Sequence, residues 1–492
     1  MPLLALMVGT LLCLQNSVEI GEFGAVPDGR TLNTEVFRKA IESAQQRKAR
    51  IVTVPPGTYL TGTIRIPSGI ELHLKQGAVI LGSPHHADYL RGVWPALILA
   101  SDADNISITG AGIIDGQGAE VAKDVLHLVQ IGKLKIPPKG WRPSEVDRPE
   151  VIEFTRCHHV RIQGVTLKNS TCWVQTYRNC TDLSIEDETV DSKTYWNNDG
   201  IDIVDCQRVK ITGCNIDSND DGICLKSVGP KAACEDIEVR QCKVRSSASA
   251  IKFGTSSGGG FRRIHIDGMS IHDTFRSAIA LESVDGGTLE DVLIENVSAK
   301  HTGNPFFIRL GHRNLRASVG RVRRVKIRNL DVEVPEGRPD FGYPFKGPQF
   351  GEPHNIEPSS IIGHRDSAIT DISLENIKLT MPGGSNPSIA RVRQSEINKI
   401  PERPTDYPEF TMLGELPAWG VYIRHAKGIQ LKNIQIVLKK PEFRAAIVLD
   451  DAHEISMKDI KISGAETLHK VILRHSSHVS VPPHIHKSIV RS

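Results

Sequence analysis

The sequence lacks the features that most directly mark nucleic-acid-binding and membrane-spanning proteins. Its formal net charge is only +3, and no basic run with interleaved aromatic residues occurs, so we expect no nucleic-acid partner. Beyond the first residues no apolar segment is long enough to span a bilayer, so we expect no membrane partner. Hydrophobic residues make up 39% and charged residues 24%, a balance that allows a large buried core.

The apolar run Leu3–Leu14 has the length of the hydrophobic region of a secretory signal, although no basic residue precedes it. The run is too short to cross a membrane. We interpret residues 1–17 as a signal peptide, with an N-terminal strand of the mature protein as the alternative. We therefore expect a secreted protein, extracellular or periplasmic, whose residues 18–492 form a single catalytic domain.

One short pattern of alternating apolar residues recurs from about residue 160. Its first copy, Val160–Leu167, reads as two short alternating strands with a polar break between them. Further copies begin at Val209, Ile237, Ile264, Val292, Val325, Ile372, Ile429 and Ile455. The copies from Val209 to Val292 start 28, 27 and 28 residues apart, and no stretch between them has the length and period of a helix.

A repeat of this length that contains only strands and turns cannot bury its apolar face alone. Stacked as coils of a parallel β-helix, each copy pairs with the next at about 4.8 Å. We therefore predict an all-β fold, a right-handed parallel β-helix (a solenoid). A β-propeller is the alternative, but it needs about 40 residues per repeat.

Three segments depart from the repeat. Residues 33–47 carry apolar residues at helical spacing and predict a short N-terminal helix that caps the first coil. Two insertions rich in Pro and Gly, residues 333–371 and 380–428, interrupt the later copies. Loops this long in a compact fold are usually functional or disordered, so we expect them to wall a cleft.

The chain has nine cysteines, of which Cys13 falls in the predicted signal. One equivalent position in successive copies holds Cys157, Cys180, Cys206 and Cys234, and another holds Cys214 and Cys242. Such columns suit an internal stack of small apolar side chains, so we expect buried thiols. Disulfides are the alternative, because an even number of cysteines remains in a chain expected to be secreted.

Carboxylates recur at one position of the repeat. Alignment of Asn198-Asp199-Gly200 with Asp220-Asp221-Gly222 stacks Asp199 on Asp221, with Asp220 and Asp202 nearby. Like charges this close cannot all ionise freely, so one should carry a raised pKa and serve as a general acid beside an ionised base. The alternatives are turn chemistry of the Asp-Gly dipeptides and a Ca²⁺ site.

Charged side chains, most of them basic, are expected to point outward from the same strands. Lys226, Glu282 and Arg309 are expected to share one column, Lys252 to share the column of Asp202, and His312 to follow. Lys and Arg side chains can hold the carboxylates of a uronic acid polymer. For each of them the alternative is a charged network on a solvated face.

At these residues the sequence resembles glycoside hydrolase family 28, the polygalacturonases and rhamnogalacturonan hydrolases, over nearly the whole chain. The family's Asn-Thr-Asp motif appears as Asn197-Asn198-Asp199, and its paired aspartates as Asp220-Asp221. The resemblance implies an inverting hydrolase in which Asp220 is the general acid, while Asp199 and Asp221 activate water. It also implies an acidic plant-cell-wall-type polysaccharide or oligosaccharide as substrate, with no cofactor and no metal.

Two motifs of the family do not occur here. The Gly-His-Gly motif would fall near Ser249, and the Arg-Ile-Lys motif at Ala280-Leu281-Glu282. Basic residues of the same face are candidates to replace them. The predicted substrate-binding residues are Asn198, Asp202, Lys226, Lys252, Glu282, Arg309 and His312.

Three functions remain open at this point. The first is an inverting glycoside hydrolase on pectin. The second is a polysaccharide lyase on the same scaffold, in which Lys252 could act as the base. The third is a carbohydrate-binding β-helix without catalytic activity. Release of reducing sugar without an unsaturated product separates the first from the second, and no product at all favours the third.

Overall fold

The computed structural model describes residues 17–138, 140, 142–337, 339, 355, 357–385, 396–466, 471–486 and 488–491. The predicted signal peptide, apart from Ser17, lies outside the described residues. The chain divides into two compact units, residues 1–219 and 220–492, and each is described by itself. The prediction that residues 18–492 form one domain stays a prediction.

Unit 1 consists of short strands with few helices. Its elements are β1 Ser17–Glu19, η1 Ile20–Phe23, β2 Asp28–Leu32, α2 Thr34–Arg47, β3 Ile51–Val54, β4 Gly57–Thr61, β5 Ile64–Arg65, β6 Glu71–Leu74, β7 Ala78–Gly82, η2 His86–Asp88, β8 Ala96–Ser101, β9 Asp104–Gly110, β10 Ile113–Asp115, α3 Gly118–Gln130, η3 Glu145–Asp147, β11 Glu150–Thr155, β12 His158–Gln163, β13 Thr166–Lys168, β14 Gln175–Arg178, β15 Thr181–Glu186, β16 Thr189–Ser192, β17 Ile201–Val204, β18 Gln207–Thr212 and β19 Asn215–Ser218.

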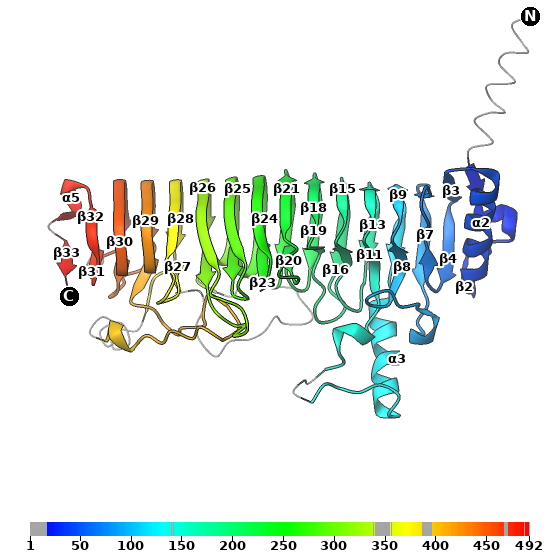
Figure 1. Ribbon diagram of the computed structural model, residues 1–492, viewed down its shortest axis with the longest axis horizontal. Helices are drawn as coiled ribbons and strands as arrows, with labels where there is room; N and C mark the ends of the chain where they lie inside the picture. Colours follow the sequence, from blue (N-terminus) through cyan, green and yellow to red (C-terminus); the bar gives the residue numbers. More distant parts are fainter. Residues whose placement is uncertain are drawn as a thin grey trace, which may run out of the picture. The chain divides into compact units, whose positions relative to one another are not determined.

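Three successive strands make one coil of unit 1, and each strand pairs in parallel with its equivalent in the next coil (Figure 1). In one column Val160 pairs with Leu183, which pairs with Val209. These apolar side chains are at most 2% exposed and fill the inside of the coil. The parallel β-helix predicted from the repeat is confirmed, because every coil buries its apolar face between its neighbours.

A column of thiols continues this core. Cys157, Cys180 and Cys206 each precede the second strand of successive coils and are fully buried. The backbone N–H of Cys180 lies 3.3 Å from Sγ of Cys206. All eight cysteines that the structure describes are buried thiols, which confirms the preference over disulfides.

Two helices accompany the coils of unit 1. The predicted capping helix is α2, whose Phe37 and Ile41 are buried against the first strands. The second helix, α3, was not expected from the sequence. It lies in an insertion between β10 and β11, and its apolar residues Val121 and Val125 are buried. This insertion continues through η3 to the start of β11.

Unit 2 has longer strands. Its elements are β20 Ile223–Ser227, β21 Cys234–Arg240, β22 Lys243–Ser246, β23 Ile251–Ser257, β24 Gly260–Ser283, β25 Thr288–Leu310, β26 Arg321–Glu333, β27 Ser359–Ile362, β28 Ile369–Met381, η4 Ile397–Lys399, β29 Ala418–Leu438, β30 Ala445–Gly464, β31 Val471–Arg474, β32 Ser477–Ser480, α5 Pro483–His486 and β33 Ile489–Arg491.

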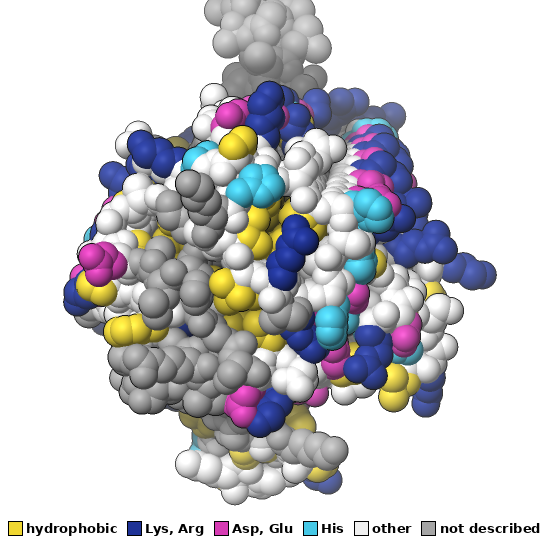
Figure 2. Space-filling model, turned by 90° about the vertical axis from the view of Figure 1, so that its left-hand side faces the viewer, with side chains coloured by type: hydrophobic (Ala, Val, Ile, Leu, Met, Phe, Trp, Pro, Cys, Tyr) yellow, Lys and Arg dark blue, Asp and Glu magenta, His cyan; other side chains and the backbone are white. Residues whose placement is uncertain are grey.

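The strands of unit 2 also pair in parallel from coil to coil, and several continue around the corners of the coil. Apolar residues such as Ile264 and Val292 pair in register and are at most 2% exposed. On the outer surface, charged residues pair instead: Glu290 contacts both Arg323 and Arg324. Figure 2 shows rows in which basic and acidic side chains alternate in this way.

The two predicted loops are partly strand. Within residues 333–371 the structure has β27, which pairs with β25 and β29. Within residues 380–428 it has η4, and β29 begins at Ala418. The two ranges thus include strand residues, and the expectation that they wall a cleft stays a prediction. No helix among the described residues is long and apolar enough to cross a membrane.

Candidate active site

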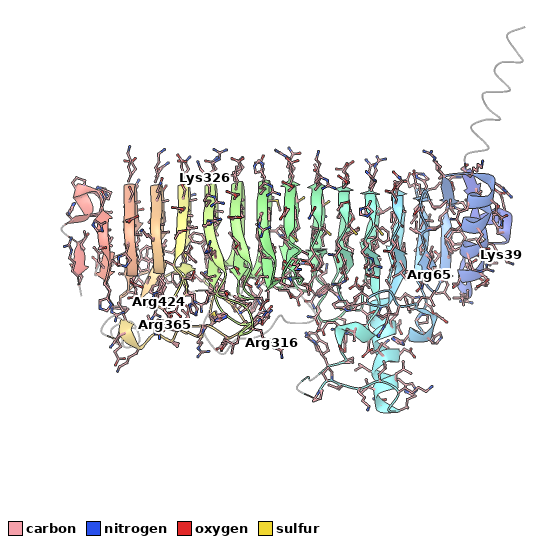
Figure 3. The ribbon with its side chains drawn as sticks, in the orientation of Figure 1. Lys39, Arg65, Arg316, Lys326, Arg365 and Arg424 are labelled. Atoms are coloured by element: carbon pink, nitrogen blue, oxygen red, sulfur yellow. The ribbon has the colours of Figure 1, made fainter. Side chains whose placement is uncertain are left out.

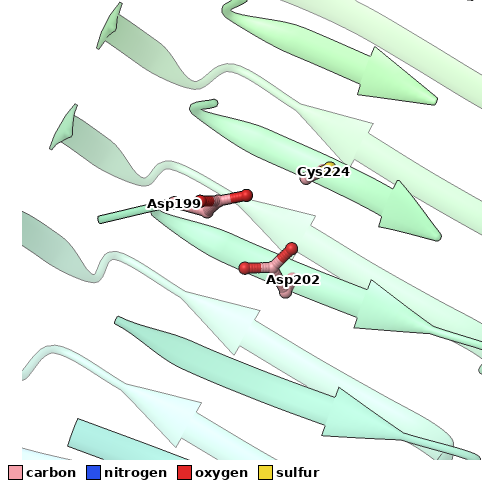
Figure 4. A group of neighbouring side chains, drawn as sticks. All are labelled: Asp199, Asp202 and Cys224. Atoms are coloured by element: carbon pink, nitrogen blue, oxygen red, sulfur yellow. The ribbon is translucent and has the colours of Figure 1, made fainter. Parts of the chain in front are cut away.

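Unit 1 brings two of the predicted carboxylates together. Asp199 lies in the turn before β17, and Asp202 is the second residue of that strand, in register with Thr176 of β14. A carboxylate oxygen of Asp199 lies within 4.8 Å of one of Asp202. Figure 4 shows both side chains on the same side of the strand. They are 4% and 0% exposed, so the protein holds two acidic groups away from bulk water.

Asn198, expected to bind substrate, instead anchors the turn that carries Asp199. Its side chain is fully buried. Its Oδ1 accepts a hydrogen bond from the Ser192 hydroxyl at 2.8 Å, and its Nδ2 donates to the carbonyl oxygens of Ser170 and Cys172 at 3.2 and 2.9 Å. The amide is thus used at both ends within the chain, and substrate binding by Asn198 stays a prediction.

In unit 2 the paired aspartates have different surroundings. Asp221 is 5% exposed, and its Oδ1 accepts a hydrogen bond from the backbone N–H of Ser249 at 2.9 Å. Asp220 is only half-buried, and its Oδ1 accepts a hydrogen bond from the N–H of Asp221 at 3.0 Å. The expected meeting of Asp199 with these two aspartates falls across the division between the units and stays a prediction.

Lys252 and Glu282, both predicted to bind substrate, form a buried ion pair in unit 2. Nζ of Lys252 lies 2.7 Å from Oε1 of Glu282, and both side chains are 0% exposed. Nζ of Lys252 also lies 5.7 Å from the centre of the Tyr407 ring. Neither charged group reaches the surface, and their expected role as direct ligands of substrate stays a prediction.

A second buried ion pair was missed by the sequence reasoning. Nη1 of Arg276 lies 2.5 Å from Oε2 of Glu409, with side chains 4% and 3% exposed. Arg276 comes from the long strand β24, whereas Glu409 comes from the insertion before β29.

Together with Asp221, the two buried ion pairs contain more carboxylates than cations, and the pKa values of their groups are shifted. Burial raises the pKa of Glu282 to about 8, opposed by the charge of Lys252 and assisted by Glu409 and Asp221. Burial by itself would lower the pKa of Lys252. The nearby charge of Glu282 has the larger opposite effect, so the pKa of Lys252 lies well above its ordinary value. Burial likewise acts against the charge of Arg276, but Glu409 is nearby and the pKa is raised. The network therefore raises the pKa of the Glu282 carboxyl and of the two cations beside it.

Arg309 holds a loop in place rather than facing substrate. It pairs in register with Glu282, as the predicted column requires. Its guanidinium is 1% exposed and donates to the carbonyl oxygens of Glu402 and Arg403 at 2.8 and 3.2 Å. These contacts tie the insertion before β29 to β25, and substrate binding by Arg309 stays a prediction.

Further cations gather at the same loop. Arg424 and Arg365 both approach Oε1 of Glu402, at 2.6 and 3.9 Å. They lie near one another on the loop side of unit 2 (Figure 3). Arg365 is the exposed member of the pair, with 67% of its side chain accessible. Sequence reasoning missed both residues. Arg424 continues the column of Arg309 through Ile362, but the aligned copies ended at Arg309. Arg365 lies between β27 and β28, outside the strands.

Lys226 and His312 are the predicted cationic residues that stay closest to solvent. Lys226 is 8% exposed, and its Nζ lies 3.0 Å from Sγ of Cys224. His312 is half-buried, and its Nε2 lies 2.8 Å from the carbonyl oxygen of Ala317. Both remain candidates for contact with an acidic substrate.

One group on the outer surface of unit 2 has the residue types of a metal site: His265, Asp267 and Glu295. However, Nη1 of Arg240 lies 3.1 Å from Asp267, and Arg328 binds Glu295. These guanidinium groups occupy the carboxylates, so the arrangement is better described as an ion-pair network.

A family model described as "Glycosyl hydrolases family 28" matches residues 44–334. A probable polygalacturonase of Vitis vinifera is 27% identical over 324 residues, covering 60% of this chain and 63% of that protein. An exo-poly-alpha-D-galacturonosidase of Dickeya chrysanthemi is 37% identical over 125 residues, covering 22% and 20%. The chain thus spans less than two thirds of the length of these curated relatives.

Solved structures with the same fold include enzymes of this kind. The exopolygalacturonase of Thermotoga maritima is 24% identical with a TM-score of 0.59, covering 74% of this chain and 87% of that one. The family 28 exopolygalacturonase of Yersinia enterocolitica is 18% identical with a TM-score of 0.58, covering 95% and 79%. At these identities the likeness establishes the fold.

Proposed function

Because the chain belongs to glycosyl hydrolases family 28, we propose that it hydrolyses glycosidic bonds of a pectin-type polysaccharide with inversion of configuration. Asp220 is the proposed general acid, which protonates the leaving oxygen. Asp199 and Asp221 are the proposed groups that orient and deprotonate water. An inverting pair needs carboxyls roughly 6.5–9.5 Å apart to leave room for that water, against about 5–5.5 Å in a retaining enzyme.

The observation that carries this proposal is the unequal setting of Asp220 and Asp221. The N–H group of Ser249 donates a hydrogen bond to the buried carboxylate of Asp221 and fixes its position, as a base that orients water requires. Asp220 is more exposed than Asp221, as a group that must reach the leaving oxygen of a substrate requires. Two neighbouring carboxyls in different environments are suited to opposite roles in proton transfer.

We propose an acidic substrate because basic side chains, among them Arg365 and Arg424, lie on the loop side of unit 2 (Figure 3). Lys226, His312 and Arg365 are candidates to bind uronate carboxylates through charge-assisted hydrogen bonds. The buried ion pairs Lys252–Glu282 and Arg276–Glu409 support the same region without reaching the surface.

The lyase alternative is disfavoured by the state of Lys252. A base that removes the proton from C5 must be neutral and accessible to substrate. Lys252 is 0% exposed, paired with Glu282 at 2.7 Å, and its pKa is raised, so it stays charged. A binding protein without catalytic activity is the remaining alternative, and an activity assay decides it.

The test is incubation of the purified chain with a panel of pectic fractions. Hydrolysis predicts new reducing ends without the ultraviolet absorbance of an unsaturated sugar, and early-time NMR should show products of inverted anomeric configuration. An unsaturated product would favour the lyase, retention of configuration would contradict the assigned roles, and no product from any fraction would favour the binding protein.

We also propose that the chain is secreted, because residues 3–14 have the length of the hydrophobic region of a signal peptide. Expression of the full chain with a C-terminal tag tests this proposal. Tagged protein outside the cytoplasm, shortened near residue 17, is the expected result. Full-length protein retained in the cytoplasm would contradict it.

A further inference from the structure

Arg276 stands in the same column of unit 2 as Asp220, the proposed general acid. Strand β20 pairs in parallel with β23, and β23 pairs with β24, and in each strand the first paired residue is an isoleucine. Asp220, Ala248 and Arg276 each lie three residues before that isoleucine. The backbone N–H of Arg276 donates to the carbonyl oxygen of Ala248 at 2.9 Å, so the stacking continues through these residues. Coils about 4.8 Å apart place the backbone of Arg276 roughly 10 Å from that of Asp220.

Between these two charged residues the column has only the methyl group of Ala248. Ala248 is 0% exposed and Arg276 is 3% exposed, so the guanidinium is held inside the protein. The carboxylate of Asp221 extends toward the same coil, because its Oδ1 accepts a hydrogen bond from the N–H of Ser249, the residue after Ala248. An arginine side chain is long enough to reach over Ala248 toward both aspartates.

The insertion before β29 fixes the position of this guanidinium. Nη1 of Arg276 lies 2.5 Å from Oε2 of Glu409. The carbonyl oxygen of Glu409 accepts a hydrogen bond from the N–H of Met412 at 2.9 Å. Phe410, the next residue after Glu409, is 1% exposed and belongs to a buried apolar cluster with Met412 and Tyr422. The insertion thus has a core of its own, which presents Glu409 at a defined place.

The charges around Arg276 favour its positive form. Burial acts to lower the pKa of Arg276, but it is raised by, in order, Glu409, Tyr407, Asp220 and Asp221. The charge of Asp221 also acts on the side chains of Lys252, Glu282 and Tyr407. Lys252 and Glu282 bind each other at 2.7 Å, and a tyrosine hydroxyl is ordinarily neutral below about pH 10. Among these groups of unit 2, Arg276 is the cation that stands in the column of Asp220.

We propose that Arg276 is a positioning residue of the acid–base pair: Glu409 directs its guanidinium along the column, where the positive charge stabilises the negative charge of Asp220 and Asp221. A nearby opposite charge favours the ionised form of a carboxyl group. The insertion before β29 thereby sets the pH range over which the enzyme works. This inference rests on the proposed function and adds a residue that tunes its acid and base.

The test measures kcat/KM against pH on the pectic fraction that the wild-type protein hydrolyses best. The two limbs of a bell-shaped profile report the essential base and the essential acid. Arg276→Gln removes a positive charge and should move both limbs to higher pH, by roughly one unit. Glu409→Gln removes the opposing charge and should move both limbs to lower pH. The double variant, Arg276→Gln with Glu409→Gln, should keep an upward shift, because we place the arginine nearer the aspartates than the glutamate.

A second buried ion pair provides the matched control. Nη2 of Arg444 lies 2.9 Å from Oε2 of Glu442, and both side chains are 0% exposed. Nη1 of Arg444 also donates to the carbonyl oxygen of Leu416, in the same insertion as Glu409. The pair lies just before β30, and the strands β23, β24, β25, β27 and β29 stand between β20 and β30 in the stack. Arg444→Gln with Glu442→Gln should therefore leave both limbs at the wild-type pH values.

The double variant decides between a positioning role and a purely structural one. Limbs at the wild-type pH in the folded double variant would overturn the inference, because the pair would then act as a neutral unit. A lower rate at every pH without a shift in any variant would overturn it as well, while hydrolysis by the wild-type protein leaves the proposed function intact. If a single-substitution variant does not fold, the double variant still decides, since it leaves no uncompensated charge in the pair. No hydrolysis of any fraction by the wild-type protein would overturn both the proposed function and this inference.

Discussion

At the scale of single residues, Asp220 should be the most sensitive position of unit 2. We expect Asp220→Asn to lower kcat roughly 10²–10⁴-fold, because the amide cannot donate a proton to the leaving oxygen. Steady-state kinetics on the best pectic fraction would measure the loss. Asp236→Asn is the matched control, since that aspartate pairs with Arg263 on the outer surface and should leave kcat unchanged. A near-normal rate for Asp220→Asn would contradict its role as the acid.

The raised pKa of Glu282 predicts how the stability of the folded protein depends on pH. Its pKa is raised from 4.5 to about 8 in the folded protein, so its contribution to stability is fully present below pH 4.5 and is lost as pH rises through about 8. Glu282→Gln keeps a neutral side chain beside Lys252 and does not lose this contribution. The difference in Tm, wild type minus Glu282→Gln, should therefore fall as pH rises through this window.

Thermal melts of both proteins across that pH range measure this difference. Parallel curves would show that Glu282 is ionised in the folded protein throughout, in an ordinary ion pair with Lys252. A difference that grows with rising pH would reverse the sign of the linkage and contradict the raised pKa.

At the scale of elements, the insertion before β29 is fastened to β24 by the Arg276–Glu409 pair. Glu409→Ala leaves Arg276 as an uncompensated buried charge, which typically costs about 3–5 kcal/mol. We expect a clear drop in Tm. Glu454→Ala is the control, because its partner Lys427 and Glu454 itself are both 54% exposed and such surface pairs contribute little. Equal Tm values for the two variants would show that this pair does not anchor the insertion.

At the scale of the whole molecule, an open end of a parallel stack is a risk for self-association, because its backbone groups can pair with another chain. Helix α2 protects the first coil of unit 1, with Phe37 fully buried beneath it. Phe37→Ala should cost about 3–5 kcal/mol through the cavity it leaves. Lower Tm and increased light scattering on warming are the expected results, and Lys39→Ala on the same helix should behave as wild type.

The repeat made the architecture predictable from the sequence. Copies such as Val160–Leu167 place apolar residues with period two, and a unit too short to bury its own face must stack. The columns of thiols and the register of Glu282 with Arg309 followed from the same spacing. The α3 insertion and strand β27 were not predicted, because neither shows the repeated residue pattern. Each forms through local packing contacts that occur only once in the chain.

By itself the sequence determined the β-helix, the capping helix and the candidate catalytic aspartates. The spacing of residues along a repeat fixes which side chains share a column. The tertiary structure alone decided which of those side chains are accessible. Asn198 and Arg309 looked like ligands of substrate, but their N–H groups donate to backbone carbonyl oxygens of Cys172 and Glu402, which are far from them in the sequence. Burial and the partners that loops supply are set by packing in three dimensions, and no periodicity in the chain records them.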